Sequence, residues 1–120
     1  MASTVLIVDD HESFRSVARE LLTSFGYRVV GEADDGASTL VAARDLRPDL
    51  ILLDVQLPDA DGFEVTRRLT ASGIGSAVVL VSSREARTYG KRLEASSALG
   101  FIYKGDLTAE RIAAFLPDGG

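Results

Sequence analysis

Acidic, hydroxyl and amine side chains stand where the short apolar runs of this chain end. These residues are Asp9, Asp10, Asp54, Ser82 and Lys104. Carboxylate oxygens are ligands of Mg²⁺ and Mn²⁺, and magnesium beside a lysine is a common arrangement for holding a phosphoryl group. An ionised aspartate can also attack phosphorus as a nucleophile. The residue types therefore indicate phosphoryl chemistry if the fold brings them together.

Three convergent carboxylates need a neutralising charge. At ~5 Å and an effective dielectric of ~20, each pair of ionised carboxylates repels by about 3 kcal/mol. Taken singly, the residues have ordinary explanations, since Asp10 could cap a helix and Ser82 could begin a turn. Polar groups at the same end of every relevant strand are harder to explain in this way. We therefore expect a hard divalent cation, Mg²⁺ or Mn²⁺, at the carboxylates.

Five short segments are typical of β-strands. Residues 5–8, 50–53 and 77–81 are apolar throughout, which indicates central parallel strands covered on both faces. Residues 28–33 and 100–103 are more mixed, which suits the edges of a sheet. The strands that precede the acidic residues and Ser82 are therefore the predicted centre of the sheet.

Helical patterns separate these strands. Asp35 and Asp61 are the expected N-caps of the second and third helices. The fourth helix covers about 84–97, and Gly90 inside it costs about 1 kcal/mol relative to alanine, so we expect this helix to be short, broken or mobile. The last helix covers about 108–116. The side chains expected to be buried by the first helix are Phe14, Val17, Ala18, Leu21, Leu22 and Phe25.

Strands and helices alternate in a (βα)5 order, which predicts an α/β fold with a doubly wound parallel sheet. The three apolar strands must be central, so the expected order of the five strands is 2-1-3-4-5. Right-handed crossovers place helices on both faces. In such sheets, ligands bind outside the carboxyl ends of the strands, at the switch point beside strand 1. The polar residues listed above follow those ends.

The composition fits one globular domain. The chain has 120 residues, no cysteine and a net charge of −5 from eighteen acidic and thirteen basic residues. We expect a single domain over 1–120, with 117–120 as a tail or the start of a linker. Disulfides, thiolate metal sites and a cysteine nucleophile are excluded. The acidic balance argues against direct nucleic-acid binding, and no apolar run approaches the ~20 residues of a membrane span, so we expect a cytoplasmic protein without membrane contact.

An ordered set of motifs resembles the response regulator receiver domain of bacterial two-component signalling, a CheY-like domain with the flavodoxin-like fold. The resemblance extends over the whole chain, and the ordered set is far more specific than any one motif. The motifs are VDDH at 8–11, DVQLPDADG at 54–62, VSS at 81–83 and GFIYK at 100–104.

The resemblance implies that Asp54 is the phosphoacceptor. Asp10 and Asp54 would ligate magnesium, the Gln56 backbone carbonyl would be a further ligand, and Asp9 would act mainly through water. A phosphorylated Asp54 would carry about two negative charges and more acceptor oxygens.

The resemblance also implies a switch. Ser82 and Lys104 would bind the phosphoryl oxygens, and an inward movement of Ser82 would leave space into which the ring of Phe101 can turn. Both states must lie within a few kcal/mol of each other. The signal would leave through the face made by helix 84–97, strand 100–103 and the last helix.

The chain departs from the family pattern after Lys104. Gly105 stands where the family usually has a proline that forms a cis bond, and a cis bond before a residue other than proline costs about 3 kcal/mol, so we expect a different loop path. Glycine tolerates unusual dihedral angles, which would be one substitute. Phe101 also lacks the hydroxyl of the commoner tyrosine.

Two positions beside the site are expected to tune the loss of the phosphoryl group. They are Gln56, two residues after Asp54, and Arg84, two residues after Ser82. We hypothesise that the long cationic side chain of Arg84 shields the acyl phosphate from water. The only histidine, His11, is expected to be a solvated residue at the start of the first helix.

These implications predict a signalling phosphoacceptor, with magnesium-dependent self-phosphorylation from a donor and autodephosphorylation as its only reactions. The expected partners are a histidine kinase or phosphotransfer protein and a downstream protein or C-terminal output domain. The chain itself is expected to be a monomer or weak homodimer. A pseudo-receiver that works without phosphorylation is the alternative. A phosphohydrolase is disfavoured because Gln56 stands where such enzymes carry a second aspartate, and no phosphate-binding glycine motif is present.

Overall fold

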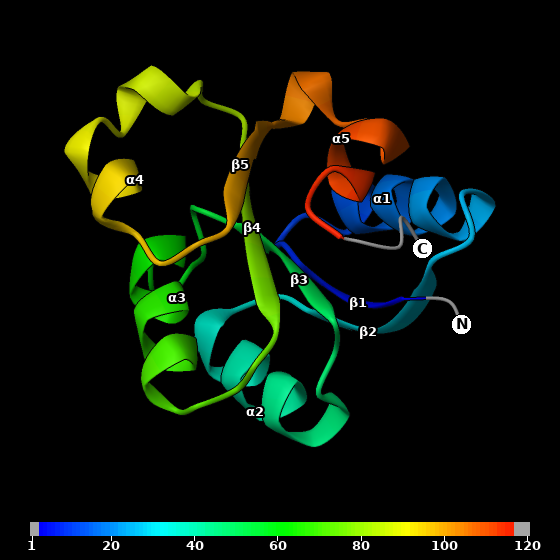
Figure 1. The fold of residues 1–120 in the computed structure, drawn as a ribbon, viewed down its shortest axis with the longest axis horizontal. Helices are drawn as coiled ribbons and strands as arrows, with labels where there is room; N and C mark the ends of the chain where they lie inside the picture. Colours follow the sequence, from blue (N-terminus) through cyan, green and yellow to red (C-terminus); the bar gives the residue numbers. More distant parts are fainter. Residues whose placement is uncertain (1–2, 117–120) are drawn as a thin grey trace.

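Five parallel strands form one sheet in the order β2-β1-β3-β4-β5 (Figure 1). The computed structural model describes residues 3–116. The predicted class and strand order are confirmed, with the mixed segments at the two edges. The strands are β1 (Thr4–Val8), β2 (Arg28–Ala33), β3 (Leu50–Asp54), β4 (Ala77–Ser82) and β5 (Gly100–Tyr103).

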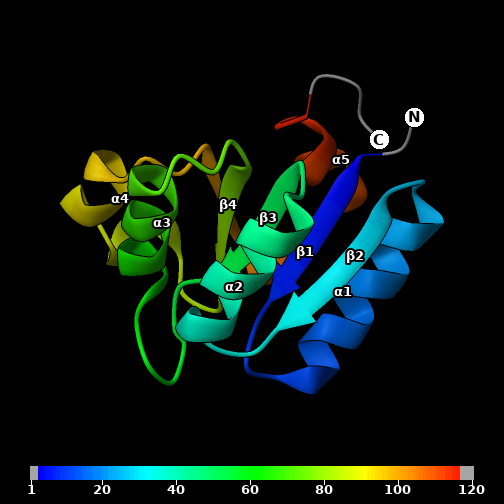
Figure 2. The same ribbon diagram turned by 90° about the horizontal axis from the view of Figure 1, so that it is seen from below.

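Helices cover both faces of the sheet. One face is covered by α1 and α5, and the other by α2, α3 and α4 (Figure 2). The helices are α1 (Glu12–Ser24), α2 (Gly36–Leu46), α3 (Gly62–Ala71), α4 (Lys91–Ala95) and α5 (Ala109–Ala113), with 3-10 turns at Ala86–Thr88 and Lys104–Asp106.

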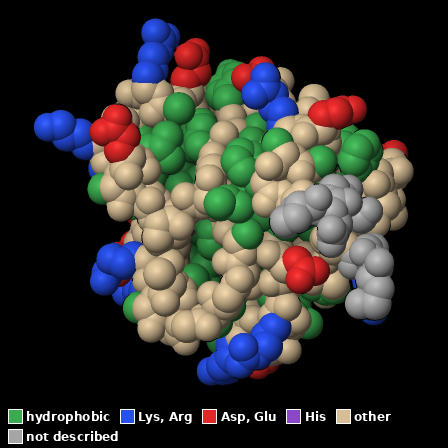
Figure 3. Space-filling model, viewed as in Figure 1, with side chains coloured by type: hydrophobic (Ala, Val, Ile, Leu, Met, Phe, Trp, Pro, Cys, Tyr) green, Lys and Arg blue, Asp and Glu red, His purple; other side chains and the backbone are tan. Residues whose placement is uncertain are grey.

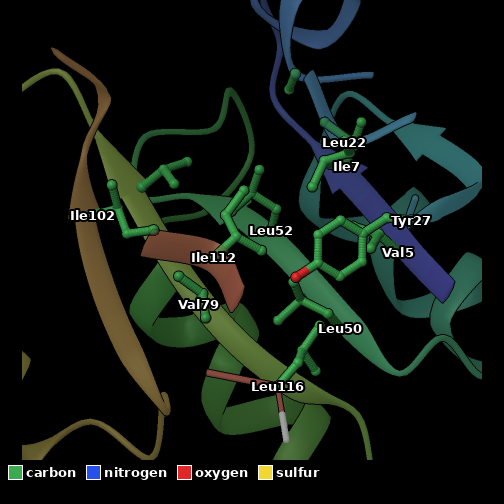
Figure 4. Close-up of a cluster of buried hydrophobic side chains, with 12 residues drawn as sticks. Val5, Ile7, Leu22, Tyr27, Leu50, Leu52, Val79, Ile102, Ile112 and Leu116 are labelled. Carbon is green, nitrogen blue, oxygen red and sulfur yellow. The ribbon is translucent and has the colours of Figure 1, made fainter. Parts of the chain in front are cut away.

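Each central strand contributes to two hydrophobic cores, because successive side chains point to opposite faces. In β1, Val5 and Ile7 pack toward α1 and α5, whereas Leu6 and Val8 pack toward α2 and α3. All four of these side chains are fully buried. Figure 4 shows the first of the two cores, in which the ring of Tyr27 lies beside Val5 and Leu50. Because the central strands are packed on both faces, their ends, which carry the polar residues, are held in place.

The expected caps of α2 and α3 are confirmed. The side chain of Asp35 accepts from Ser38 N at 2.8 Å, and that of Asp61 accepts from Glu64 N at 2.9 Å. Each contact satisfies an N–H group that the first turn of a helix leaves free.

The predicted apolar face of α1 is partly wrong. Val17 and Phe25 are 61% and 42% exposed, although their spacing suggested burial. Phe14, Ala18 and Leu22, which are spaced by four residues, make the contact with the sheet instead. The sheet covers only a narrow stripe of α1, so Val17 lies outside that stripe, and Phe25 is the C-cap residue beyond the end of the helix.

The fourth helix is broken, as Gly90 led us to expect. A 3-10 turn at Ala86–Thr88 precedes α4, and Gly90 lies between them with φ 49° and ψ −121°. Side chains disfavour that conformation, so glycine allows the break. The last helix is shorter than expected: α5 ends at Ala113, and Phe115, beyond its end, is half-buried.

Two further expectations concern the ends of the chain and the membrane. The tail expected at 117–120 lies outside the described residues. Within residues 3–116, no helix is both long and apolar enough to cross a membrane.

Candidate functional site

The ammonium group of Lys104 lies close to carboxylates at the ends of two other strands. It follows β5, and its Nζ lies 2.5 Å from Asp9 Oδ2 and 3.6 Å from Asp54 Oδ2. Asp9 follows β1 and is fully buried. The Lys104 ammonium group also lies 4.3 Å from the centre of the Phe14 ring, a favourable cation–π distance. Parallel pairing thus brings Asp9, Asp54 and Lys104 together at the carboxyl edge of the sheet.

The environment of Asp54 disfavours the ionised form of its carboxyl group. It is the last residue of β3 and only 3% exposed. Burial, followed by the charge of Asp9, raises the pKa of Asp54 to about 6, against the opposing effects of Lys104 and of the Gln56 backbone amide. That amide donates to Asp54 Oδ1 at 3.3 Å. One ammonium group therefore does not fully compensate two buried carboxylates.

Asp10 and His11 extend the acidic cluster toward solvent. Ligand atoms of Asp9, Asp10, His11 and Asp54 all lie within 4.8 Å of one another. The Nδ1 atom of His11 lies 3.0 Å from Asp9 Oδ1 and 3.0 Å from Asp10 Oδ1. The His11 side chain is 68% exposed, so it is solvated as expected, but its contacts with both carboxylates were not predicted.

The carboxylates of Asp9, Asp10 and Asp54 fit a hard divalent cation. Their oxygens are the ligands that Mg²⁺ and Mn²⁺ prefer. The carboxylates also repel one another at this distance, and a bound cation would reduce that repulsion. Gln56, whose carbonyl is the fourth predicted ligand, is an exposed residue in the loop between β3 and α3.

The loop from Val55 to Asp61 is held to its surroundings by two sets of hydrogen bonds. The carboxylate of Asp59 accepts from Gly36 N at 2.6 Å and from Ala37 N at 3.0 Å, at the N-terminus of α2. These amides lower the pKa of Asp59. Gly62 N donates to Val55 O at 2.6 Å, directly beside Asp54. The backbone that carries Asp54 is thereby held on both sides.

Ser82 contacts a tyrosine that no sequence motif singled out. Ser82 ends β4 and is buried, and its Oγ lies 2.5 Å from the hydroxyl oxygen of Tyr89. Ser82 Oγ also accepts from Arg84 N at 3.0 Å. The contact with Tyr89 depends on how the chain turns back between β4 and α4, and no spacing rule predicts it.

Phe101 adjoins Tyr89 in this contact, and the backbone amide of Arg84 adjoins Ser82. The half-buried ring of Phe101 is 5.9 Å from the Tyr89 ring, centre to centre. The Arg84 side chain is exposed and lines a shallow hollow with Tyr103. The structure thus connects Phe101 to Ser82 through Tyr89 and places Arg84 beside Tyr103.

The sequence pattern of the response regulator receiver domain matches residues 5–115. The chain belongs to this family. The receiver domain is 40% identical over 111 residues to the response regulator GacA of Pseudomonas viridiflava, covering 92% of this chain and 52% of GacA. It is 36% identical over 114 residues to the transcription regulator BvgA of Bordetella pertussis, covering 95% of this chain and 54% of BvgA.

The fold of the receiver domain matches a solved relative closely. Its TM-score with the signal receiver domain of NarL from Mycobacterium tuberculosis is 0.85 at 33% identity, covering 98% of this chain and 96% of that one. The chain spans about half the length of the curated relatives it matches. It is therefore the receiver domain of a two-component response regulator, and receiver domains are signalling phosphoacceptors.

The loop after Lys104, where Gly105 stands in place of the usual proline, has only trans peptide bonds. Residues 3–116 contain no cis peptide bond, so the Lys104–Gly105 bond is trans, and the chain continues into the 3-10 turn Lys104–Asp106. The φ of Gly105 is not among the positive values. A Cβ atom at Gly105 would instead lie 2.5 Å from the Tyr103 ring, so close packing explains the glycine better than an unusual dihedral angle.

Proposed function

We propose that Asp54 accepts a phosphoryl group from a histidine kinase or a phosphotransfer protein. The observation that carries this proposal is the buried Asp54 carboxylate, 3.6 Å from the Lys104 ammonium group and beside a second buried carboxylate. An Asp54 oxygen forms a bond to phosphorus while the bond from phosphorus to the donor breaks. The donor histidine keeps that electron pair on its ring nitrogen.

We propose that Asp9, Asp10, Asp54 and the Gln56 carbonyl hold Mg²⁺, or Mn²⁺ in its place. Asp10 and Asp54 contribute oxygens directly, and Asp9 acts mainly through water. A bound Mg²⁺ neutralises charge on the carboxylates and on phosphoryl oxygens. Burial and the charge of Asp9 raise the pKa of Asp54, so a bound cation would favour its ionised form.

Lys104 and Ser82 bind the phosphoryl oxygens in this proposal. Lys104 already contacts two carboxylates, so its ammonium group can follow the added charge on Asp54. Ser82 has a hydroxyl hydrogen to donate once a phosphoryl oxygen is in reach. The rearrangement at Ser82 then shifts Phe101, which is packed half-buried on β5.

The output surface is the face that contains α4, β5 and α5. On this face, hydrophobic side chains gather between charged groups that lie mostly at the rim (Figure 3). A protein partner or an output domain of the same regulator would bind here and respond to the state of Phe101. We take residues 1–120 as one receiver domain, acting in the cytoplasm as a monomer or weak homodimer and without nucleic acid as a direct ligand.

Gln56 and Arg84 tune the lifetime of the phosphoryl group. Both side chains are exposed, and they follow Asp54 and Ser82 by two residues, so in this proposal they limit the access of water to Asp54. We expect Arg84→Ala to shorten the half-life of the phosphorylated protein, measured by the decay of the phosphate adduct. An unchanged half-life would exclude the shielding role of Arg84.

The decisive experiment is incubation with acetyl phosphate and Mg²⁺, followed by intact mass spectrometry. Wild type should gain one phosphate and Asp54→Asn none, while Asp45→Asn, a change at an exposed carboxylate on α2, should gain it as wild type does. An adduct that persists in Asp54→Asn would place the acceptor elsewhere. The absence of an adduct on wild type, and of a response to beryllofluoride, would instead indicate a module that works without phosphorylation.

A further inference from the structure

We propose that Tyr89 is a positioning residue that holds the Ser82 hydroxyl and carries the state of the phosphoryl site into the segment 84–95. The inference rests on the proposed role of Ser82 in binding phosphoryl oxygens. It begins from the 2.5 Å contact between the hydroxyl oxygens of Ser82 and Tyr89. Tyr89 differs both from the acidic residues of the site and from Phe101, the expected switch residue on β5.

The hydrogen bonds of Ser82 fix the direction of this contact. A serine hydroxyl has one hydrogen to donate and two lone pairs to accept with. Arg84 N already donates to one lone pair at 3.0 Å. When Ser82 turns inward and donates its hydrogen to a phosphoryl oxygen, a Tyr89 hydroxyl that stays in contact can only donate to the remaining lone pair. Phosphorylation therefore sets the polarity of the Ser82–Tyr89 bond.

The bond should be stronger in the phosphorylated state. A hydroxyl that donates to an anion becomes a better acceptor, because hydrogen bonds in a chain polarise one another. Tyr89 would then support Ser82 in donating to the phosphoryl group, and the phosphoryl group would in turn anchor Tyr89. This reciprocity is required of any coupling between two binding events.

Tyr89 stands at the joint between two pieces of secondary structure. Its N donates to Ala86 O at 3.0 Å, at the end of the 3-10 turn, and its carbonyl accepts from Arg92 N at 3.1 Å, at the start of α4. Gly90, with φ 49°, follows directly. A restraint on the Tyr89 side chain therefore acts on the turn before Gly90 and on the helix after it.

The ring of Tyr89 connects the joint to the rest of the molecule. It lies 5.4 Å from the Phe63 ring of α3 in an edge-on contact and 5.9 Å from the Phe101 ring of β5. Such contacts keep the ring in place when the hydroxyl is removed, because they do not involve the oxygen. Tyr89→Phe is therefore a clean test of the hydroxyl alone.

The test compares Tyr89→Phe with wild type in titrations with beryllofluoride and Mg²⁺, followed by NMR. We expect Tyr89→Phe to weaken beryllofluoride binding by about fivefold, the loss of one ordinary hydrogen bond. It should also reduce the extra protection from hydrogen exchange that the ligand gives to amides of 84–95. The control is Tyr103→Phe, which removes an exposed hydroxyl from the neighbouring strand and should change neither quantity.

A Ser82→Ala background separates positioning from a merely structural role. Without the Ser82 hydroxyl, Tyr89→Phe should cause no further loss of beryllofluoride affinity. An equal loss in both backgrounds, or none in wild type, would overturn the inference. Thermal unfolding by circular dichroism identifies any variant that fails to fold.

Measurements on the protein without ligand test the Ser82–Tyr89 contact even if the proposed function is wrong. In that event wild type would neither bind beryllofluoride nor gain phosphate. Hydrogen exchange without ligand should still be faster across 84–95 in Tyr89→Phe and in Ser82→Ala, and the double variant should match the single ones. Additive effects, or no effect, would show that the hydroxyl pair does not position this segment.

Discussion

At the scale of single residues, the hydroxyl of Tyr27 is a polar group that the core buries without a partner. It is buried and has no hydrogen-bond partner among the described residues, and burial raises the pKa of Tyr27 (Figure 4). Removal of an unpaired buried hydroxyl relieves its desolvation cost. We expect Tyr27→Phe to increase the free energy of unfolding in urea by about 1 kcal/mol. Tyr103→Phe should leave it unchanged, and a less stable Tyr27→Phe would reveal a missing partner.

The raised pKa of Asp54 makes the folded protein less stable as the pH rises. The folded protein releases the Asp54 proton near pH 6, whereas an unfolded aspartate releases it at about 3.9. The stabilising contribution of the protonated group is thus complete below pH 4 and is lost as pH rises through 6, a change of about 3 kcal/mol at most.

Asp54→Asn should remove that dependence. In EDTA at pH 7, we expect the variant to unfold at a higher urea concentration than wild type, because no ionised carboxylate is buried at position 54. The difference should shrink as the pH approaches 4.5. A variant that is less stable than wild type at pH 7 would mean that Lys104 compensates the Asp54 charge more fully than its distance suggests.

At the scale of elements, the start of α3 packs directly against the strand end that carries Asp54. A Cβ atom at Gly62 would lie 2.7 Å from Asp54 O and 2.9 Å from Val55 Cα, and backbone atoms cannot move aside cheaply. We expect Gly62→Ala to lower the free energy of unfolding by about 2 kcal/mol and to slow phosphorylation by acetyl phosphate. Gly75→Ala is the matched control, since a Cβ atom there would meet open space.

The strands and their order could be predicted because both depend on local patterns. Continuous apolar runs mark the buried strands, and the mixed composition of 28–33 and 100–103 marks the edges. The break at Gly90 followed from helix propensity alone. The burial of Val17 and Phe25 was wrongly predicted, because periodicity shows that a helix has an apolar side but does not say how wide a stripe the sheet covers.

Convergence of Asp9, Asp54 and Lys104 could be predicted for a similar reason. Parallel strands end at one edge, so residues that follow them meet there. The contacts of His11 and Tyr89 could not be predicted, because each depends on the path of a loop. The spacing between Ser82 and Tyr89 does not predict whether the Tyr89 hydroxyl contacts Ser82 or faces solvent.

At the scale of the whole molecule, cation binding should stabilise the entire fold. A ligand that binds only the folded state adds about 1.4 kcal/mol when its free concentration is ten times its Kd. We expect Mg²⁺ to raise the urea midpoint of wild type progressively with concentration. Asp54→Asn should lose most of this response, and sodium chloride at equal ionic strength serves as the control. Equal responses of both proteins would show that Mg²⁺ acts outside the acidic cluster.

The ion pair between Lys104 and Asp9 joins residues 95 positions apart. Within this domain, synthesis reaches β1 long before β5, so the buried Asp9 has no lysine beside it until almost the whole domain has been made. A chain that stops short of Lys104 holds Asp9 and Asp54 without the cation that contacts both of them. Charge compensation at this edge of the sheet is thus a late step in the folding of the domain.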